Sequence, residues 1–217
     1  MNKNTEVKLL IGDLVGDLIN NNISVKFENK KESNCSEYGK EILCEGWFDD
    51  SKKELVCAVK QPLEIWISVF IHEYSHFKQW EERSSLYTSN RIDLIYDCFL
   101  EGRKINNNKL SKAINKIQNM EYDCEKRSVD LIIKYKLPFN IYRIIQRSNA
   151  YIYFYSITQK LGGWYYTSPS MVKEIVDRMP GAFLYKVKHY RHLEEPKLFN
   201  LYKKYCMKKN QETEVIK

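Results

Sequence analysis

The sequence predicts an α+β protein in which an N-terminal helix, a small three-stranded sheet and one central helix precede a mostly helical C-terminal half. The first observation is a helical repeat of apolar residues near the N-terminus, at Val7, Leu10, Ile11, Leu14 and Leu18. The second is the alternation of apolar and polar residues over 23–28, which is typical of a half-buried strand. The third is a series of long helical patterns after residue 90.

The sheet and the central helix are expected between the N-terminal helix and residue 82. Residues 29–39 are polar and are expected to form a loop. Two further strand candidates cover residues 41–48 and 53–59, and the polar turn between them favours a hairpin. Pro62 opens the central helix, at a position where its missing N–H costs nothing.

The remaining helices are separated by clear stop signals. They are expected over 91–101, 111–135 and 140–160, which end at Gly102, Leu137-Pro138 and Gly162-Gly163. Ser168-Pro169 begins a short helix and Pro196 begins the last one.

Composition places the chain among soluble globular proteins, because 43% of its 217 residues are hydrophobic and 29% are charged. No apolar run approaches the length needed to span a bilayer, and the N-terminus lacks the apolar core of a signal peptide. The six cysteines include no C-x-x-C pair, which favours reduced thiols, with Cys98 and Cys124 as small core residues. We therefore expect a cytoplasmic protein without a membrane partner.

The net charge of +7 permits contact with nucleic acid or acidic protein. However, the sequence contains no helix-turn-helix, zinc-finger or aromatic RNA-binding signature. Specific recognition of nucleic acid is therefore not expected, and the sequence leaves the oligomeric state open.

The central helix carries the pattern His-Glu-x-x-His at His72, Glu73 and His76. In a helix the two histidines lie one turn apart on the same face, where two imidazoles can bind one Zn²⁺ while the glutamate reaches a water on the open side of the metal. The alternative is a buried helix whose histidines are hydrogen-bonded core residues. Apolar residues surround the motif, and burying two histidines and a glutamate is costly unless a metal compensates, so the metal site is favoured.

A catalytic zinc needs a third protein ligand. The pattern H-E-x-x-H-x-x-G-x-x-H does not continue here, because Gln79 and Glu82 stand where glycine and a third histidine would be. Glu121 lies on the apolar stripe of the helix 111–135, where a charge needs a partner and a metal would serve. Its alternative partner is a nearby lysine or arginine, and Glu125 follows one turn later.

The chain resembles zincin metallopeptidases, and in particular gluzincins, through His72-Glu73-x-x-His76 and the later pair Glu121 and Glu125. The resemblance implies a minimal zincin core in which Glu121 is the third zinc ligand and Glu125 is the outer carboxylate that orients a ligand histidine. Glutamate replaces the usual aspartate at the second position, so Glu125 is the alternative ligand. Similar motifs occur in repressor-cleaving peptidases and in metallopeptidases encoded by tailed phages. In those families a strand beside the cleft binds extended substrate, and residues 53–59 are either that strand or an ordinary inner strand.

The expected function is zinc-dependent hydrolysis of peptide bonds, as an endopeptidase, with Glu73 as the general base that activates a zinc-bound water. A protein or peptide is the expected substrate, in the cytoplasm, or in the host cytoplasm if a phage encodes the chain. Residues 1–137 would form the catalytic core, and residues 138–217 a helical extension packed on it within one continuous domain. The alternative is a catalytically inactive zincin-fold binding or structural protein.

Overall fold

The computed structural model of the chain describes residues 3–37, 40–87, 90–193 and 196–207. Within these ranges the chain is an α+β protein with a small mixed sheet and a helical C-terminal half, so the predicted fold class is confirmed. It forms two compact units. The first comprises residues 1–87 and 124–139, and the second comprises residues 88–123 and 140–217. The predicted division at residue 137 stays a prediction.

The first unit contains every described strand. Its elements, in chain order, are α1 (Lys3–Asn20), β1 (Ser24–Glu28), β2 (Ser33–Glu37), β3 (Lys40–Cys44), β4 (Gly46–Asp49), β5 (Glu54–Ala58), α2 (Leu63–Glu81) and the end of α4 (Asn107–Lys134). The prediction of a loop over 29–39 is wrong in part, because β2 pairs there with β3 in an antiparallel hairpin. The predicted strand 41–48 is divided between β3 and β4, which belong to different sheets.

The three-stranded sheet has the order β1-β5-β4. β5 runs parallel to β1 and antiparallel to β4, and pairs with both along its length. Residues 53–59 therefore form the inner strand, which was one of the two interpretations of that segment. Because both edges of β5 are hydrogen-bonded, it has no free edge on which to add a substrate strand.

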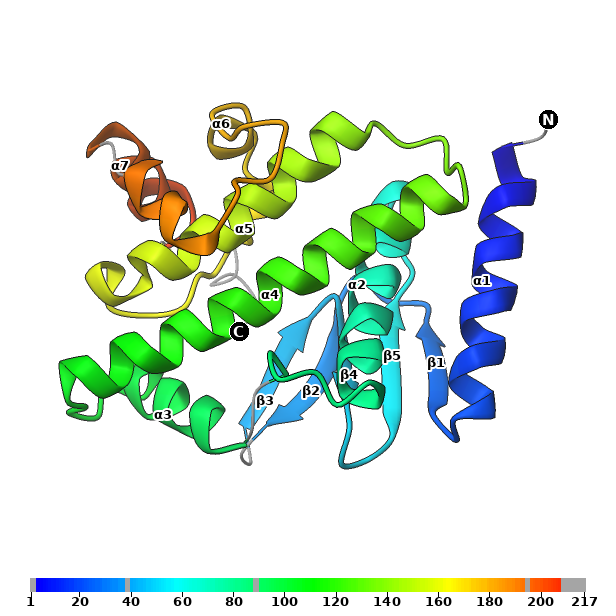
Figure 1. The fold of residues 1–217 in the computed structure, drawn as a ribbon, viewed down its shortest axis with the longest axis horizontal. Coiled ribbons are helices and arrows are strands. Elements are labelled where there is room, and N and C mark those ends of the chain that lie inside the picture. Colours follow the sequence, from blue (N-terminus) through cyan, green and yellow to red (C-terminus); the bar gives the residue numbers. More distant parts are fainter. Residues whose placement is uncertain (1–2, 38–39, 88–89, 194–195, 208–217) are drawn as a thin grey trace, which may run out of the picture. The chain divides into compact units, whose positions relative to one another are not determined.

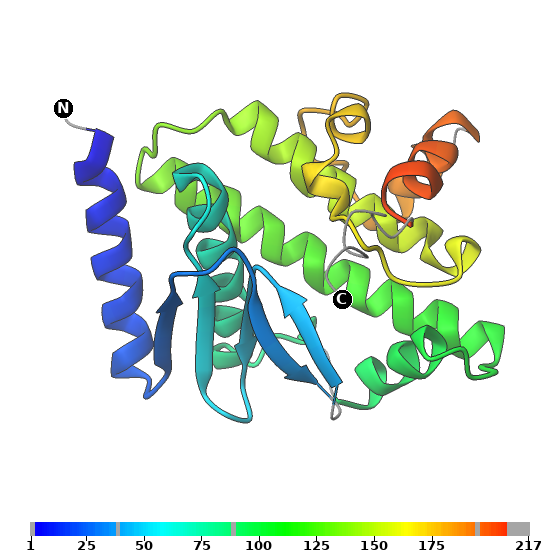
Figure 2. The same ribbon diagram turned by 180° about the vertical axis from the view of Figure 1, so that it is seen from behind.

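Helix α2 covers one face of this sheet, and α1 lies beside β1 (Figure 1). From behind, the sheet lies in front of α2 (Figure 2). Aromatic rings fill the interface: the ring centroids of Phe27 and Phe70 are 5.2 Å apart, and those of Phe48 and Phe77 are 5.9 Å apart. The apolar face of α2 thus packs on the buried strand β5 and its neighbours, and this core holds the motif helix against the sheet.

At Gly46 the strand β4 passes close to α2. A Cβ at this position would lie 2.7 Å from Cγ1 of Val69 and 3.0 Å from the carbonyl oxygen of Val56. Both distances are shorter than a carbon contact allows, so only glycine fits between the strand and the helix.

We expect Gly46→Ala to lower the free energy of unfolding by about 1–3 kcal/mol, because the added methyl group overpacks this interface. Urea unfolding followed by circular dichroism measures the change. Gly16→Ala is the matched control, since a Cβ there meets no atom within 4 Å and alanine favours the interior of α1. Equal stability of the two variants would contradict the close approach of β4 to α2.

The second unit is helical. Its elements are α3 (Asn90–Leu100), the first part of α4, α5 (Ile141–Leu161), the 3-10 helix η1 (Pro169–Met171), α6 (Lys173–Val176), the 3-10 helix η2 (Val187–Leu193) and α7 (Pro196–Tyr205). Asn140 caps α5 by accepting a hydrogen bond from the backbone N–H of Arg143, and Gly162 ends it in the left-handed conformation. Tyr153 and Tyr202 are fully buried in the core around α5. No described helix is long and apolar enough to cross a membrane.

Candidate metal centre

The two motif histidines converge as helix geometry requires. Nε2 of His72 lies 3.1 Å from Nε2 of His76, with ring centroids 4.7 Å apart. Two imidazole nitrogens that share one tetrahedral Zn²⁺, each at 2.0–2.1 Å, are roughly 3.3 Å apart. The observed separation therefore matches that of two ligands of one metal ion.

Each ring is also held at Nδ1, on the edge away from Nε2. Nδ1 of His72 lies 3.1 Å from Oε1 of Glu125, and Nδ1 of His76 lies 2.9 Å from Oε1 of Gln79. When the ring is neutral, an acceptor at Nδ1 keeps the single ring proton there and leaves the lone pair on Nε2. Glu125 thus occupies the position from which a carboxylate orients a ligand histidine.

Cys124 is the group at this site that sequence reasoning did not identify as functional. Its Sγ lies 3.2 Å from the carbonyl oxygen of His72 and 3.6 Å from Nδ1 of His72. One donor atom from each of His72, His76 and Cys124 lies within 4.8 Å of the others, so the three residues form a group that could hold a metal ion. The signal in the sequence was its position between the two acids on one face of the helix.

Small side chains let the end of α4 approach α2 closely. The hydroxyl groups of Ser75 and Ser128 lie 3.2 Å apart, and each also donates a hydrogen bond to a carbonyl one turn back in its own helix. The thiol of Cys124 makes a second contact across the same interface. This packing brings Glu125 to His72.

Negative groups dominate the surroundings of His72. Burial by itself lowers the pKa of this ring, but the neighbouring Cys124 sulfur and the Glu125 carboxylate outweigh it and hold the pKa well above its usual value. Neighbours that favour an added proton on the ring also favour a metal cation in place of that proton.

Glu73 lies beside the sheet. A Cβ at Gly46 would lie 3.4 Å from Cγ of Glu73, which places this half-buried glutamate next to the first residue of β4. Burial, followed by the charge of Glu73, raises the pKa of Cys57 on the neighbouring strand β5 to about 12. The candidate base is therefore held between the motif helix and the edge strand of the sheet.

We expect Cys57 and Cys206 to resist alkylation in the folded protein at pH 8. Burial raises the pKa of each thiol to about 12, so only about one molecule in ten thousand carries the reactive thiolate at that pH. Mass spectrometry after brief treatment with iodoacetamide should find both unmodified, with the half-buried Cys44 as the reactive control. Modification of Cys57 before Cys44 would contradict the packing of β5, whereas urea should expose all three thiols.

Glu121, the predicted third ligand, belongs to the second unit and is 6% exposed. In that unit, burial raises the pKa of Tyr151 and Tyr155 well above its usual value, and the charge of Glu121 raises it further. Cys124 and Glu125, three and four residues later in α4, belong to the first unit. The role of Glu121 as a ligand stays a prediction.

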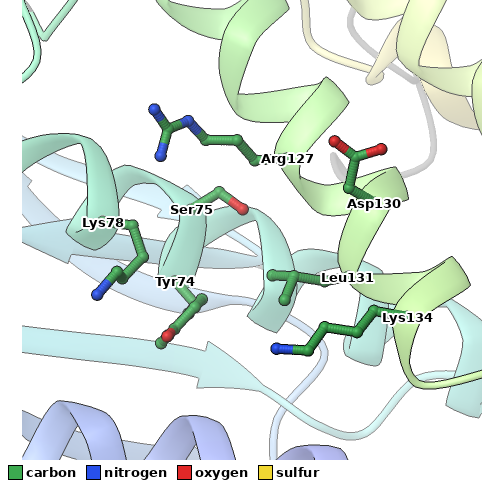
Figure 3. A pocket seen from close by; sticks show the side chains of 7 residues that line it. All are labelled: Tyr74, Ser75, Lys78, Arg127, Asp130, Leu131 and Lys134. Atoms are coloured by element: carbon green, nitrogen blue, oxygen red, sulfur yellow. The ribbon is translucent and has the colours of Figure 1, made fainter.

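A separate pocket lies on the other side of α2 (Figure 3). It is lined by Tyr74, Ser75, Lys78, Arg127, Asp130, Leu131 and Lys134. Lys78 forms ion pairs with Asp17 and Glu81, and Arg127 pairs with Glu82 at 2.9 Å. Lys78 and Arg127 therefore have acidic partners, and Tyr74 and Lys78 face away from the histidines on the helix.

Comparisons with protein-family models, with curated proteins and with solved structures give no match to this chain.

Proposed function

We propose that the chain is a zinc-dependent metallopeptidase in which His72 and His76 bind the metal and Glu73 is the general base. The observation that carries the proposal is the 3.1 Å separation of the two Nε2 atoms, with an acceptor at each Nδ1. A direct N–H···N hydrogen bond between the two rings would use only one Nε2 lone pair, whereas a metal ion between them would accept both.

The bound zinc would polarise the scissile carbonyl and lower the pKa of a water towards neutrality. Glu73 accepts a proton from the water that attacks the carbonyl carbon. It then gives this proton to the leaving nitrogen as the C–N bond breaks, and returns to its ionised form. Glu125 and Gln79 keep the two imidazole rings in place throughout.

We further propose that an extended peptide binds along β4. This strand forms one edge of the sheet and, among the described residues, pairs only with β5. Its first residue, Gly46, adjoins Glu73. A peptide that adds to this edge through main-chain hydrogen bonds would pass beside the proposed base.

The third donor would come from α4. The sequence predicts Glu121, and the structure places the Cys124 sulfur near both histidines. Replacing zinc with Co²⁺ distinguishes the two donors, because a thiolate ligand gives an intense charge-transfer absorption in the near ultraviolet and a carboxylate does not. A band that disappears in Cys124→Ser identifies sulfur as the donor. Absence of the band, with weaker binding in Glu121→Gln, identifies the carboxylate.

The position of Cys124 also supports a second candidate function. If Cys124 joined the histidines and a further protein ligand filled the last position, the coordination shell would be closed, as in structural zinc sites. The chain would then be an inactive zincin-like binding or structural protein whose metal stabilises the fold.

Metal removal tests the proposed hydrolysis. The protein is incubated with a library of short peptides, and new termini are identified by mass spectrometry. Cleavage should stop after treatment with 1,10-phenanthroline and return when stoichiometric zinc is added. Cleavage that persists in the zinc-free protein would contradict a metallopeptidase.

A further inference from the structure

Gln79 is a buried polar residue in the last turns of the motif helix. It is 0% exposed and lies three residues after His76, on the same face of α2. A buried amide is costly unless it makes hydrogen bonds, and the Gln79 carbonyl meets that need at Nδ1 of His76, 2.9 Å away.

The backbone around Gln79 is fixed as well. The backbone carbonyl oxygen of Gln79 accepts a hydrogen bond from the backbone N–H of Ser84 at 2.9 Å. The backbone N–H of Arg83 donates to the carbonyl oxygen of Trp80. Arg83 adopts a positive φ of 51°, which ends α2 at this point. The side chain of Gln79 therefore extends from a closed helix terminus rather than from a frayed one.

The amide carbonyl imposes one tautomer on His76. An oxygen can only accept, so a neutral ring must carry its proton on Nδ1 and its lone pair on Nε2. That lone pair lies on the side of His72, whose own Nδ1 is occupied by Glu125. One histidine is thus oriented by a carboxylate from α4 and the other by an amide from its own helix.

We propose that Gln79 is a positioning residue that holds His76 in the Nδ1–H tautomer, with Nε2 directed at the metal. This inference rests on the proposed metal centre. The side chain of Gln79 is also neutral. It therefore orients the ring without adding another negative charge to a site that already contains Glu73 and Glu125.

The test uses Gln79→Met, which has a similar length but no acceptor at that position, and Gln79→Glu, which restores an acceptor of the same shape. Nitrogen-15 NMR of the His76 ring in the metal-free full chain reports the tautomer directly. The wild type and Gln79→Glu should carry the ring proton on Nδ1, whereas Gln79→Met should shift it towards Nε2.

Zinc affinity, measured by competition with a chromophoric chelator, is the second readout. We expect Gln79→Met to bind zinc about 10–100-fold more weakly than the wild type, and Gln79→Glu to bind at least as tightly. Gln146→Met is the matched control, because Gln146 is also buried and hydrogen-bonded, to the carbonyl of Met179 in the second unit. It should lower stability without changing zinc affinity or the His76 spectrum.

Three results would overturn the inference: an Nε2–H tautomer in the wild type, an unchanged tautomer and affinity in Gln79→Met, or no recovery in Gln79→Glu. The first needs no variant and is decisive even if Gln79→Met fails to fold. If the wild type binds no zinc, the proposed function fails, and the tautomer comparison still decides the role of Gln79.

Discussion

Glu73→Gln is expected to abolish peptide hydrolysis while leaving zinc bound. The amide has the shape of the carboxylate but does not accept the proton of the attacking water, and loss of a general base typically lowers the rate by about 10²–10⁴-fold. Glu73 is not among the three residues whose donor atoms converge, so the metal content should stay unchanged. Peptide cleavage and zinc content are measured on the same preparation.

Glu64→Gln is the matched control for that variant. Glu64 lies in the first turn of the same helix, two turns before His72. Its replacement by glutamine removes the same charge as Glu73→Gln. It should retain full hydrolysis. Full activity in Glu73→Gln would exclude Glu73 as the base and favour the inactive-scaffold alternative for any remaining zinc site.

His76→Ala is expected to remove the metal itself. It deletes one of the two nitrogens that lie 3.1 Å apart, and loss of a ligand should weaken binding by more than the roughly 10–100-fold that loss of an orienting group causes. Binding also stabilises the fold: free zinc at 100 times its Kd should add about 2.7 kcal/mol to the free energy of unfolding of the wild type. The variant should show no such gain at the same zinc concentration.

His192→Ala separates this effect from histidine loss in general. His192 is exposed and lies in η2 of the second unit. Its variant should keep the stoichiometry and the stabilisation of the wild type. A His76→Ala protein that is still stabilised by zinc would place the metal elsewhere in the chain.

Local patterns were sufficient to predict the motif helix and its histidines. A run of apolar residues with a proline at its start specifies a buried helix, and helical spacing alone brings His72 and His76 together. Alternation identified β1 because its period of two is visible in five residues. These features depend on residues that are close together in the chain, so they can be predicted from a single sequence.

The features that were missed depend on distant pairing. The hairpin β2–β3 has little alternation in its polar first strand, and the inner position of β5 is set by hydrogen bonds to β1 on one side and β4 on the other. Cys124 looked like a small core residue because its contact with His72 comes from another helix. Gln79 was noticed only as a departure from a known motif, since an amide gives no sign in the sequence of which ring it will meet.

X-ray absorption at the zinc edge tests the central claim most directly. The full chain, loaded with one equivalent of zinc, should show scattering from two imidazole rings with nitrogens at about 2.0–2.1 Å. One of these rings should disappear in His76→Ala. A zinc shell with fewer than two imidazoles, or a protein that takes up no zinc, would contradict the claim that His72 and His76 share one metal ion.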